Sequence, residues 1–329
     1  MHTIRKIGAF GAALAASFGA AYGLGAAVGP APSAPAPAAH APHDDAPHDD
    51  ATGPGGGEAS AERPGAVPAG LQVSEGGYTL DLRTPRVTAG RIAELRFAVR
   101  DAAGRPVTAF ERDHGKELHL VVVSRDLLTY RHLHPARTAN GTWSVPVTLP
   151  AAGGYRVFAD FTPAAEGAGD LVLGADLLAA GPYAPPPAPG PNSTAAVDGY
   201  TVTLTGGLRP GAPAGLRLDV TRDGRPVTDL EPYLGAYGHL VALRSGDLAY
   251  LHVHPGGEPG DGRTRPGPGI SFTATAPSPG TYRLFLDFKH DGTVRTAAFT
   301  VRVGGAAAPA TGAPRPPSAP AHDGTAHPH

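Results

Sequence analysis

The stretches that decide the fold of this chain are FERDHGKELHLVVVSRDLLTYRHLHP at residues 110–135 and LEPYLGAYGHLVALRSGDLAYLHVHP at residues 230–255. They align without a gap, so that His119 matches His239, and both end in Tyr-x-His-x-His-Pro. A match of this length does not arise by chance, and self-similarity at a fixed spacing is the mark of an internal repeat. The sequence therefore predicts two copies of one module.

The match between the copies extends beyond these stretches. GRPVT occurs at residues 104–108 and again at 224–228. We predict a first module over residues 72–182 and a second over 196–303. The segment between them, 183–195, is rich in proline and is expected to form a semi-rigid extended spacer.

Within each module, short alternating runs of Val, Leu, Tyr, Phe and Thr are broken by Gly, Pro or Asp about every eight to twelve residues, which is typical of β-strands. The expected strands include residues 78–82, 93–99, 118–123, 142–149, 155–161, 200–204, 215–220, 239–243, 270–274, 282–288 and 297–303. Asp223-Gly224 supplies the residues of a hairpin turn. The predicted fold is all-β, with two tandem immunoglobulin-like β-sandwich modules and disordered Ala/Pro/His-rich tails.

The two ends of the chain have a different composition. Residues 1–28 begin with Arg5 and Lys6 and continue with an apolar Ala/Gly stretch, which predicts either a cleaved signal peptide or an N-terminal membrane anchor. Both interpretations place the body outside the cytoplasm, and the chain meets a membrane only through this segment if it stays uncleaved. We expect residues 29–71 and 304–329 to be disordered.

Composition also limits the function. The chain has no cysteine and a single methionine, so histidine must act as the soft ligand, which favours Cu(II), Zn(II) or Ni(II) over Cu(I). The formal net charge of -2 and the absence of a basic stripe argue against nucleic-acid binding. No phosphate loop stands out, and we expect no organic cofactor.

The recurring histidines are the candidate site. Residues two apart in a strand project from the same face, so the two histidines of each His-x-His-Pro string can approach one ion together. A third histidine lies upstream, and an aspartate recurs in the Phe-x-Asp-Phe strand, where it either faces a polar site or orients a histidine from behind. The predicted metal residues are His119, His132, His134 and Asp160 in the first copy, and His239, His252, His254 and Asp287 in the second.

Other histidines have weaker claims. His114 is replaced by Leu234 in the second copy and His290 follows only the second Asp-Phe, so both are expected to be specific to one module or incidental. The His/Asp-rich tails either bind metals loosely or are solvated spacers. Their histidines are His40, His43, His48, His322, His327 and His329.

Three segments, ELHLVVVSRDLLTYRHLHP, GTWSVPVTLPAAGGYRVFADFTP and YLGAYGHLVALRSGDLAYLHVHP, resemble a family of secreted actinobacterial proteins with duplicated His-x-His-Pro modules. These proteins are often catalogued as heavy-metal-binding-domain or secreted proteins. The resemblance covers most of residues 72–303. It implies a metal association and, as partner, an envelope protein that handles metal ions.

Two functions follow as hypotheses. The first is extracytoplasmic binding of Cu(II) or Zn(II) by histidine clusters in both modules, for buffering the ion or handing it over. The alternative is a non-catalytic cell-envelope interaction or structural protein, whose histidines are hydrogen-bonded structural residues. We predict no enzymatic activity, because no nucleophile pair or glutamate-containing metal motif stands out.

Overall fold

The computed structural model describes residues 67–304 apart from 185 and 252. The described residues all belong to one compact unit, Glu62–His329. The predicted signal peptide or anchor, most of the predicted disordered tails and His252 lie outside the described residues. In the described part of the chain, no helix is long and apolar enough to span a membrane.

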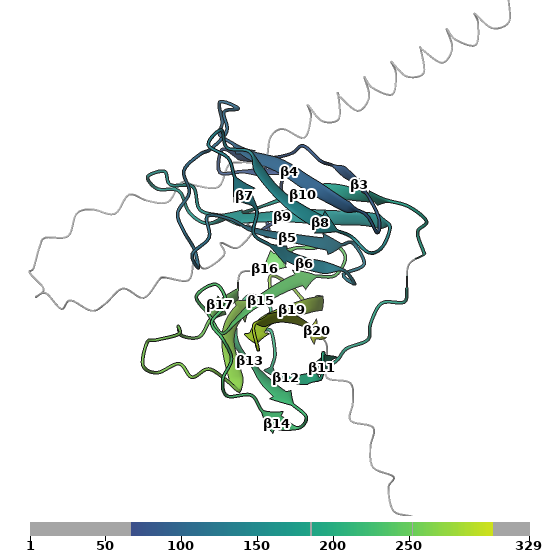
Figure 1. Cartoon of the computed structure of the whole chain (residues 1–329), viewed down its shortest axis with the longest axis vertical. Helices are drawn as coiled ribbons and strands as arrows, with labels where there is room; N and C mark the ends of the chain where they lie inside the picture. Colours follow the sequence, from purple (N-terminus) through teal and green to yellow (C-terminus); the bar gives the residue numbers. More distant parts are fainter. Residues whose placement is uncertain (1–66, 185, 252, 305–329) are drawn as a thin grey trace, which may run out of the picture. The chain divides into compact units, whose positions relative to one another are not determined.

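Ten strands form the first sandwich (Figure 1). They are β1 (Ser74–Glu75), β2 (Tyr78–Leu82), β3 (Arg86–Thr88), β4 (Ile92–Arg100), β5 (His119–Ser124), β6 (Tyr130–Leu133), β7 (Ala136–Arg137), β8 (Trp143–Thr148), β9 (Gly153–Phe161) and β10 (Leu171–Ala180). One sheet has the order β1-β2-β4-β8-β7 and the other β3-β10-β9-β5-β6. A core of residues such as Phe97, Leu120, Val122 and Val157 lies between the two sheets.

Ten further strands form the second sandwich. They are β11 (Thr194–Val197), β12 (Tyr200–Gly206), β13 (Pro213–Arg222), β14 (Arg225–Pro226), β15 (Gly238–Arg244), β16 (Tyr250–Leu251), β17 (Val253–Pro255), β18 (Gly269–Thr275), β19 (Gly280–His290) and β20 (Thr293–Val303). One sheet has the order β11-β12-β13-β18-β17, with β14 on β13, and the other β16-β15-β19-β20. Leu218, Phe272, Leu284 and Phe299 belong to the core between them.

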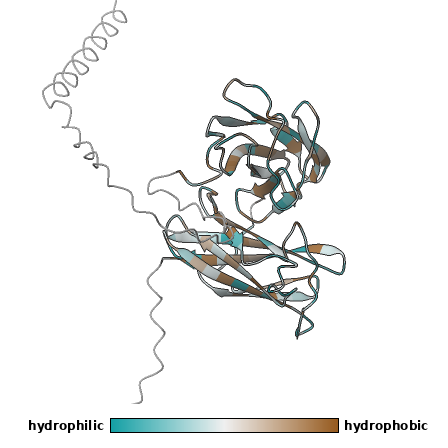
Figure 2. Cartoon of the chain, turned by 90° about the vertical axis from the view of Figure 1, so that its left-hand side faces the viewer, coloured by the Kyte–Doolittle hydropathy of each residue, from teal (hydrophilic) through white to brown (hydrophobic). Residues whose placement is uncertain are grey.

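The predicted fold class is confirmed: the described chain is all-β and forms two immunoglobulin-like sandwiches in tandem. Hydrophobic and hydrophilic residues alternate along the strands (Figure 2). The predicted turn is also present, since Asp223 and Gly224 have φ of 50° and 73° and join β13 to β14. The alternation follows from the pleat, which turns successive side chains to opposite faces.

Strand β5 departs from this alternation, because all six of its residues are buried. Leu120 and Val122 lie in the core of the first sandwich, whereas Val121 and Val123 point the other way and contact residues of the second sandwich. The residues of this inter-sandwich cluster are Val121, Val123, Leu127, Tyr130, Phe158, Val172, Val241, Leu243, Leu248, Tyr250 and Phe285. The faces of β5 and β15 that point away from their own cores are therefore both apolar, because each packs against the other sandwich.

Two aromatic pairs cross this cluster reciprocally. Tyr130 stacks on Phe285 with ring centroids 4.3 Å apart, and Tyr250 contacts Phe158 at 5.4 Å. Tyr130 and Tyr250 occupy matching positions in the two copies of the sequence, as do Phe158 and Phe285. The two sandwiches thus contact each other through like surfaces.

The folded part begins before residue 72, the predicted start of the first module. The Gly70 N–H donates to the Val172 carbonyl at 2.9 Å, and the Arg156 guanidinium donates to the Gly70 carbonyl. The Ala69 carbonyl accepts from the Tyr250 N–H at 3.0 Å. This short segment therefore contacts both sandwiches.

Candidate metal centre

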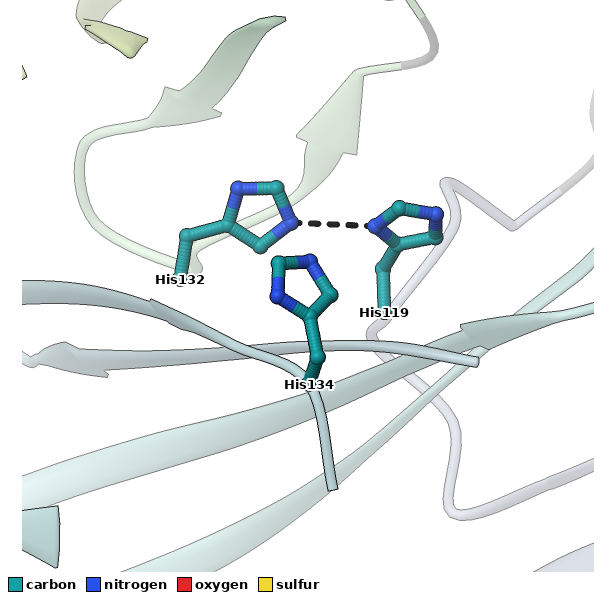
Figure 3. A group of neighbouring side chains, drawn as sticks. All are labelled: His119, His132 and His134. Atoms are coloured by element: carbon teal, nitrogen blue, oxygen red, sulfur yellow. Dashed lines mark hydrogen bonds between the residues drawn. The ribbon is translucent and has the colours of Figure 1, made fainter. Parts of the chain in front are cut away.

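Strands β5 and β6 bring three histidines together. His119 is the first residue of β5, and His132 lies in β6 opposite Val121, so both side chains project from the same face of the sheet. His134 follows β6 directly and precedes Pro135. One ligand nitrogen from each ring lies within 4.8 Å of the other two, and the rings face a common space (Figure 3). We call these three residues the histidine cluster.

The hydrogen bonds of the cluster assign its tautomers. His132 Nδ1 lies 3.0 Å from Asp287 Oδ2, and a carboxylate only accepts, so Nδ1 carries the proton and Nε2 a lone pair. His119 Nε2 lies 3.3 Å from the carbonyl oxygen of Asp113, which places the proton of that ring on Nε2. His119 Nδ1 and His132 Nε2 lie 3.1 Å apart (Figure 3). If both rings are neutral with these tautomers, both atoms are acceptors, so the contact is favourable only with a proton or a metal ion between them.

His134 adds a third nitrogen to the cluster. Its Nε2 is buried and has no hydrogen-bond partner. The His134 ring centroid is 4.9 Å from that of His132 and 5.3 Å from that of His119. A buried polar atom left unpaired lowers the stability of a fold by about 1–3 kcal/mol, and a ligand bound to this nitrogen would remove that penalty.

Burial keeps the imidazoles of His119 and His134 neutral. Desolvation, reinforced by the nearby His132, lowers the pKa of His119 to about 3. The same two causes lower the pKa of His134 to about 4. Neutral imidazole is the form that binds metal ions.

Asp287 reaches the cluster from the second sandwich. Its side chain is 3% exposed and that of His132 is 6% exposed. Besides His132, the Asp287 carboxylate accepts from the Tyr130 hydroxyl at 3.3 Å and from the Thr296 hydroxyl at 2.5 Å. Burial and the charge of Asp287 raise the pKa of Tyr130 well above its usual value, so the phenol remains a donor.

The remaining predicted residues are distributed differently. His239, paired across strands with Asp287, donates through Nε2 to the Tyr233 carbonyl at 2.8 Å. Burial lowers its pKa to about 4. Asp160, paired with His119, contacts Tyr250, whose pKa is raised by burial and then by this carboxylate. Asp287 therefore contacts a histidine of the other sandwich, and Asp160 contacts a tyrosine of the other sandwich.

The second His-x-His-Pro string is built differently from the first. Its first histidine, His252, lies outside the described residues. His254 is exposed and belongs to β17, which pairs with β18 in the opposite sheet of the second sandwich. In the described part of the chain, the trio of the histidine cluster is the one group whose ligand atoms converge.

Two residues near the cluster were missed by sequence reasoning. The His114 ring lies 5.1 Å from that of His239 and 6.5 Å from that of His119, although His114 has no counterpart in the second copy. Tyr233 lies 6.1 Å from His134, ring to ring. No local signal marks either residue, because both reach the site through loops that precede β5 and β15.

His290 lies away from the cluster, as expected. Its ring bridges the Tyr200 hydroxyl at 2.7 Å and Asp229 at 3.0 Å within the second sandwich. This histidine is a buried structural residue.

A cavity of about 410 Å³ adjoins the cluster. His119, His132 and His239 line it, together with Asp160 and His254. An ion held by the cluster would thus have a neighbouring space for a further ligand.

Solved structures with similar β-domains share little sequence with this chain. The Lin-41 filamin domain is 13% identical, with 32% of this chain and 97% of that chain covered and a TM-score of 0.21. Salmonella alpha-2-macroglobulin is 14% identical, with 72% and 15% covered and a TM-score of 0.24. Yersinia pseudotuberculosis InvD is 14% identical, with 72% and 61% covered and a TM-score of 0.23.

No curated protein matches the chain in sequence. A family model does match, and it covers both sandwiches, over residues 72–168 and 195–305. The chain therefore belongs to the family described as Domain of unknown function (DUF8832).

Proposed function

We propose that this chain binds a divalent transition metal, Cu(II) or Zn(II), through His119, His132 and His134. The ion would be buffered or handed to another protein outside the cytoplasm. The N-terminal sequence supports that location, since a positively charged start followed by an apolar stretch is typical of export.

The observation that carries the proposal is the 3.1 Å contact between His119 Nδ1 and His132 Nε2. In neutral rings whose outer N–H groups are donated to Asp113 and Asp287, these two nitrogens carry lone pairs and repel each other. An ion between them removes the repulsion. Two nitrogens that bind one tetrahedral ion at roughly 2.0–2.1 Å lie about 3.3 Å apart, close to the observed separation.

His134 and Asp287 strengthen the same interpretation. The buried His134 Nε2 has no hydrogen-bond partner and lies beside the other two nitrogens. A carboxylate behind a ligating histidine fixes the tautomer and raises the basicity of the ligand, and Asp287 stands in this position behind His132. The donor set therefore has three imidazole nitrogens and an outer carboxylate.

A structural function is the second candidate, and one observation favours it. His132 and Tyr130 of the first sandwich both donate to Asp287 of the second, so the same histidine ties the two sandwiches together. In that case the cluster would contribute to stability without an ion.

The test is a metal titration of the purified full chain with Zn(II) and with Cu(II), followed by calorimetry and metal analysis. The double variant H132A/H134A should lose tight binding. The matched control is H327A/H329A, which removes two histidines from the C-terminal tail and should keep it. Equal metal content in the wild type and H132A/H134A, with only stability lowered, would favour the structural function.

We propose binding rather than catalysis, and an envelope metal-handling protein as the partner that receives the ion. An open side of the ion toward the adjoining cavity would give such a partner a place to attach its own ligand. Transfer of Zn(II) or Cu(II) to a chelating competitor faster than spontaneous dissociation would support handover.

A further inference from the structure

We infer that Asp287 makes the metal affinity of the first sandwich depend on its contact with the second, so that metal binding and docking of the sandwiches are coupled. This inference rests on the proposed metal function. It adds that the second sandwich positions a ligand without contributing one.

The first step is the reach of Asp287. The residue belongs to β19, and its carboxylate leaves its own sandwich to accept from His132 Nδ1 and the Tyr130 hydroxyl. Thr296 of β20 donates to the other carboxylate oxygen at 2.5 Å and holds the group in place. The acceptor that orients the ligand His132 is therefore part of the partner sandwich.

The second step concerns the apolar surface that holds the sandwiches together beside the bond between Asp287 and His132. The bond between Asp287 and His132 adjoins the inter-sandwich cluster, in which Val123, Leu243 and Phe285 are buried at 2% exposure or less. Separation of the sandwiches would expose these side chains and remove the acceptor from His132. Water would then replace the carboxylate, and the Nδ1 tautomer would no longer be enforced.

The third step is thermodynamic. A ligand that binds one of two states more tightly shifts the population toward that state by the ratio of its affinities. If the docked state binds the ion better because Asp287 holds His132, the ion must in turn strengthen docking. A partner that competes for the second sandwich would then release the metal.

The experiment compares Zn(II) affinity in four full-length proteins: the wild type, D287N, L243D and Y250F. D287N keeps the size of the side chain but offers an NH2 donor beside its carbonyl, so it no longer enforces the His132 tautomer. L243D places a charge in the inter-sandwich cluster and should undock the sandwiches while leaving all three histidines in place. Y250F removes the matching inter-sandwich contact with Asp160 but leaves the bond between Asp287 and His132 in place, so it separates the effect of that bond from a general loss of docking contacts.

D287N and L243D should each bind Zn(II) about 10–100-fold more weakly than the wild type, and Y250F, which keeps the bond between Asp287 and His132, should lose less affinity than either. Trp143, the single tryptophan, is buried in the first sandwich, so unchanged emission shows that this sandwich remains folded in each variant. Long-range proton–nitrogen spectra should show His132 protonated on Nδ1 in the metal-free wild type and the alternative tautomer populated in D287N.

Docking is measured directly with spin labels, since the cysteine-free chain accepts I92C and T205C without interference. Zn(II) should narrow the label-to-label distance distribution in the wild type and leave D287N unchanged. Wild-type affinity in D287N would overturn the coupling while leaving the metal function intact. An equal loss in Y250F would overturn the specific role of Asp287, and a wild type that binds no metal would instead refute the proposed function.

Discussion

The two Tyr-x-His-x-His-Pro strings are nearly identical in sequence and different in structure. From Tyr130 the chain stays paired with β5 for four residues, and His132 lies opposite Val121. After Tyr250 the pairing with β15 ends within two residues, and β17 then joins β18 in the opposite sheet. The first string therefore stays in the sheet that contains His119, whereas the second has strands in both sheets of its sandwich. The comparison teaches that a histidine pair becomes a candidate site only where strand pairing brings a third histidine beside it.

The largest expected effect separates the two strings directly. H132A/H134A should weaken Zn(II) binding at the tight site by roughly 100-fold or more, because it removes two of three ligands. The matched change in the second string, H252A/H254A, should have a much smaller effect, since His254 is exposed on β17. Calorimetric stoichiometry and affinity check both. Equal losses in the two variants would show that the second string forms a site of the same quality.

The two recurring aspartates should also differ. D287A leaves three donors without their shared acceptor and should lower the free energy of unfolding of the metal-free protein by about 3 kcal/mol. D160A should cost about 1–2 kcal/mol, because Asp160 is only partly buried. Urea denaturation measures both, and a larger loss for D160A would contradict this ranking.

His119 and His239, the first of the recurring histidines in each copy, should make stability depend on pH in the same way. Burial lowers the pKa of His119 to about 3 and that of His239 to about 4. The unfolded chain takes up these protons near its ordinary pKa of about 6.5, and the folded chain does not, so stability is complete above that pH and declines below it. Each of these two histidines should lower the free energy of unfolding by at most about 2 kcal/mol between pH 6.5 and pH 5.

Metal-free denaturation at both pH values checks this slope. In H239Q and in H119Q, the loss of unfolding free energy between pH 6.5 and pH 5 should be smaller than in the wild type by the contribution of the one histidine removed. An unchanged slope in either variant would show that the residue is not held neutral by the fold.

The smallest expected effect concerns the GRPVT turns, which should respond equally. Gly104 and Gly224 have φ of 76° and 73°, where a side chain is strained. Nothing lies within 4 Å of an added Cβ at either position, so strain is the only cost. G104A and G224A should each lower the unfolding free energy by about 1–2 kcal/mol in thermal or urea unfolding, and an effect at only one turn would contradict their equivalence.

The sequence by itself determined the all-β class, the two tandem sandwiches, the Asp223-Gly224 turn and the shared face of His132 with the tyrosine before it. These features follow from local periodicity and turn chemistry, which act over a few residues. Only the tertiary structure decided that Asp287 belongs with His132 rather than with the histidines of its own copy. That bond joins residues 155 positions apart and depends on the packing of two apolar sheet faces. Strand periodicity marks such a face as apolar, but the surface that covers it is chosen by long-range packing, which no local pattern encodes.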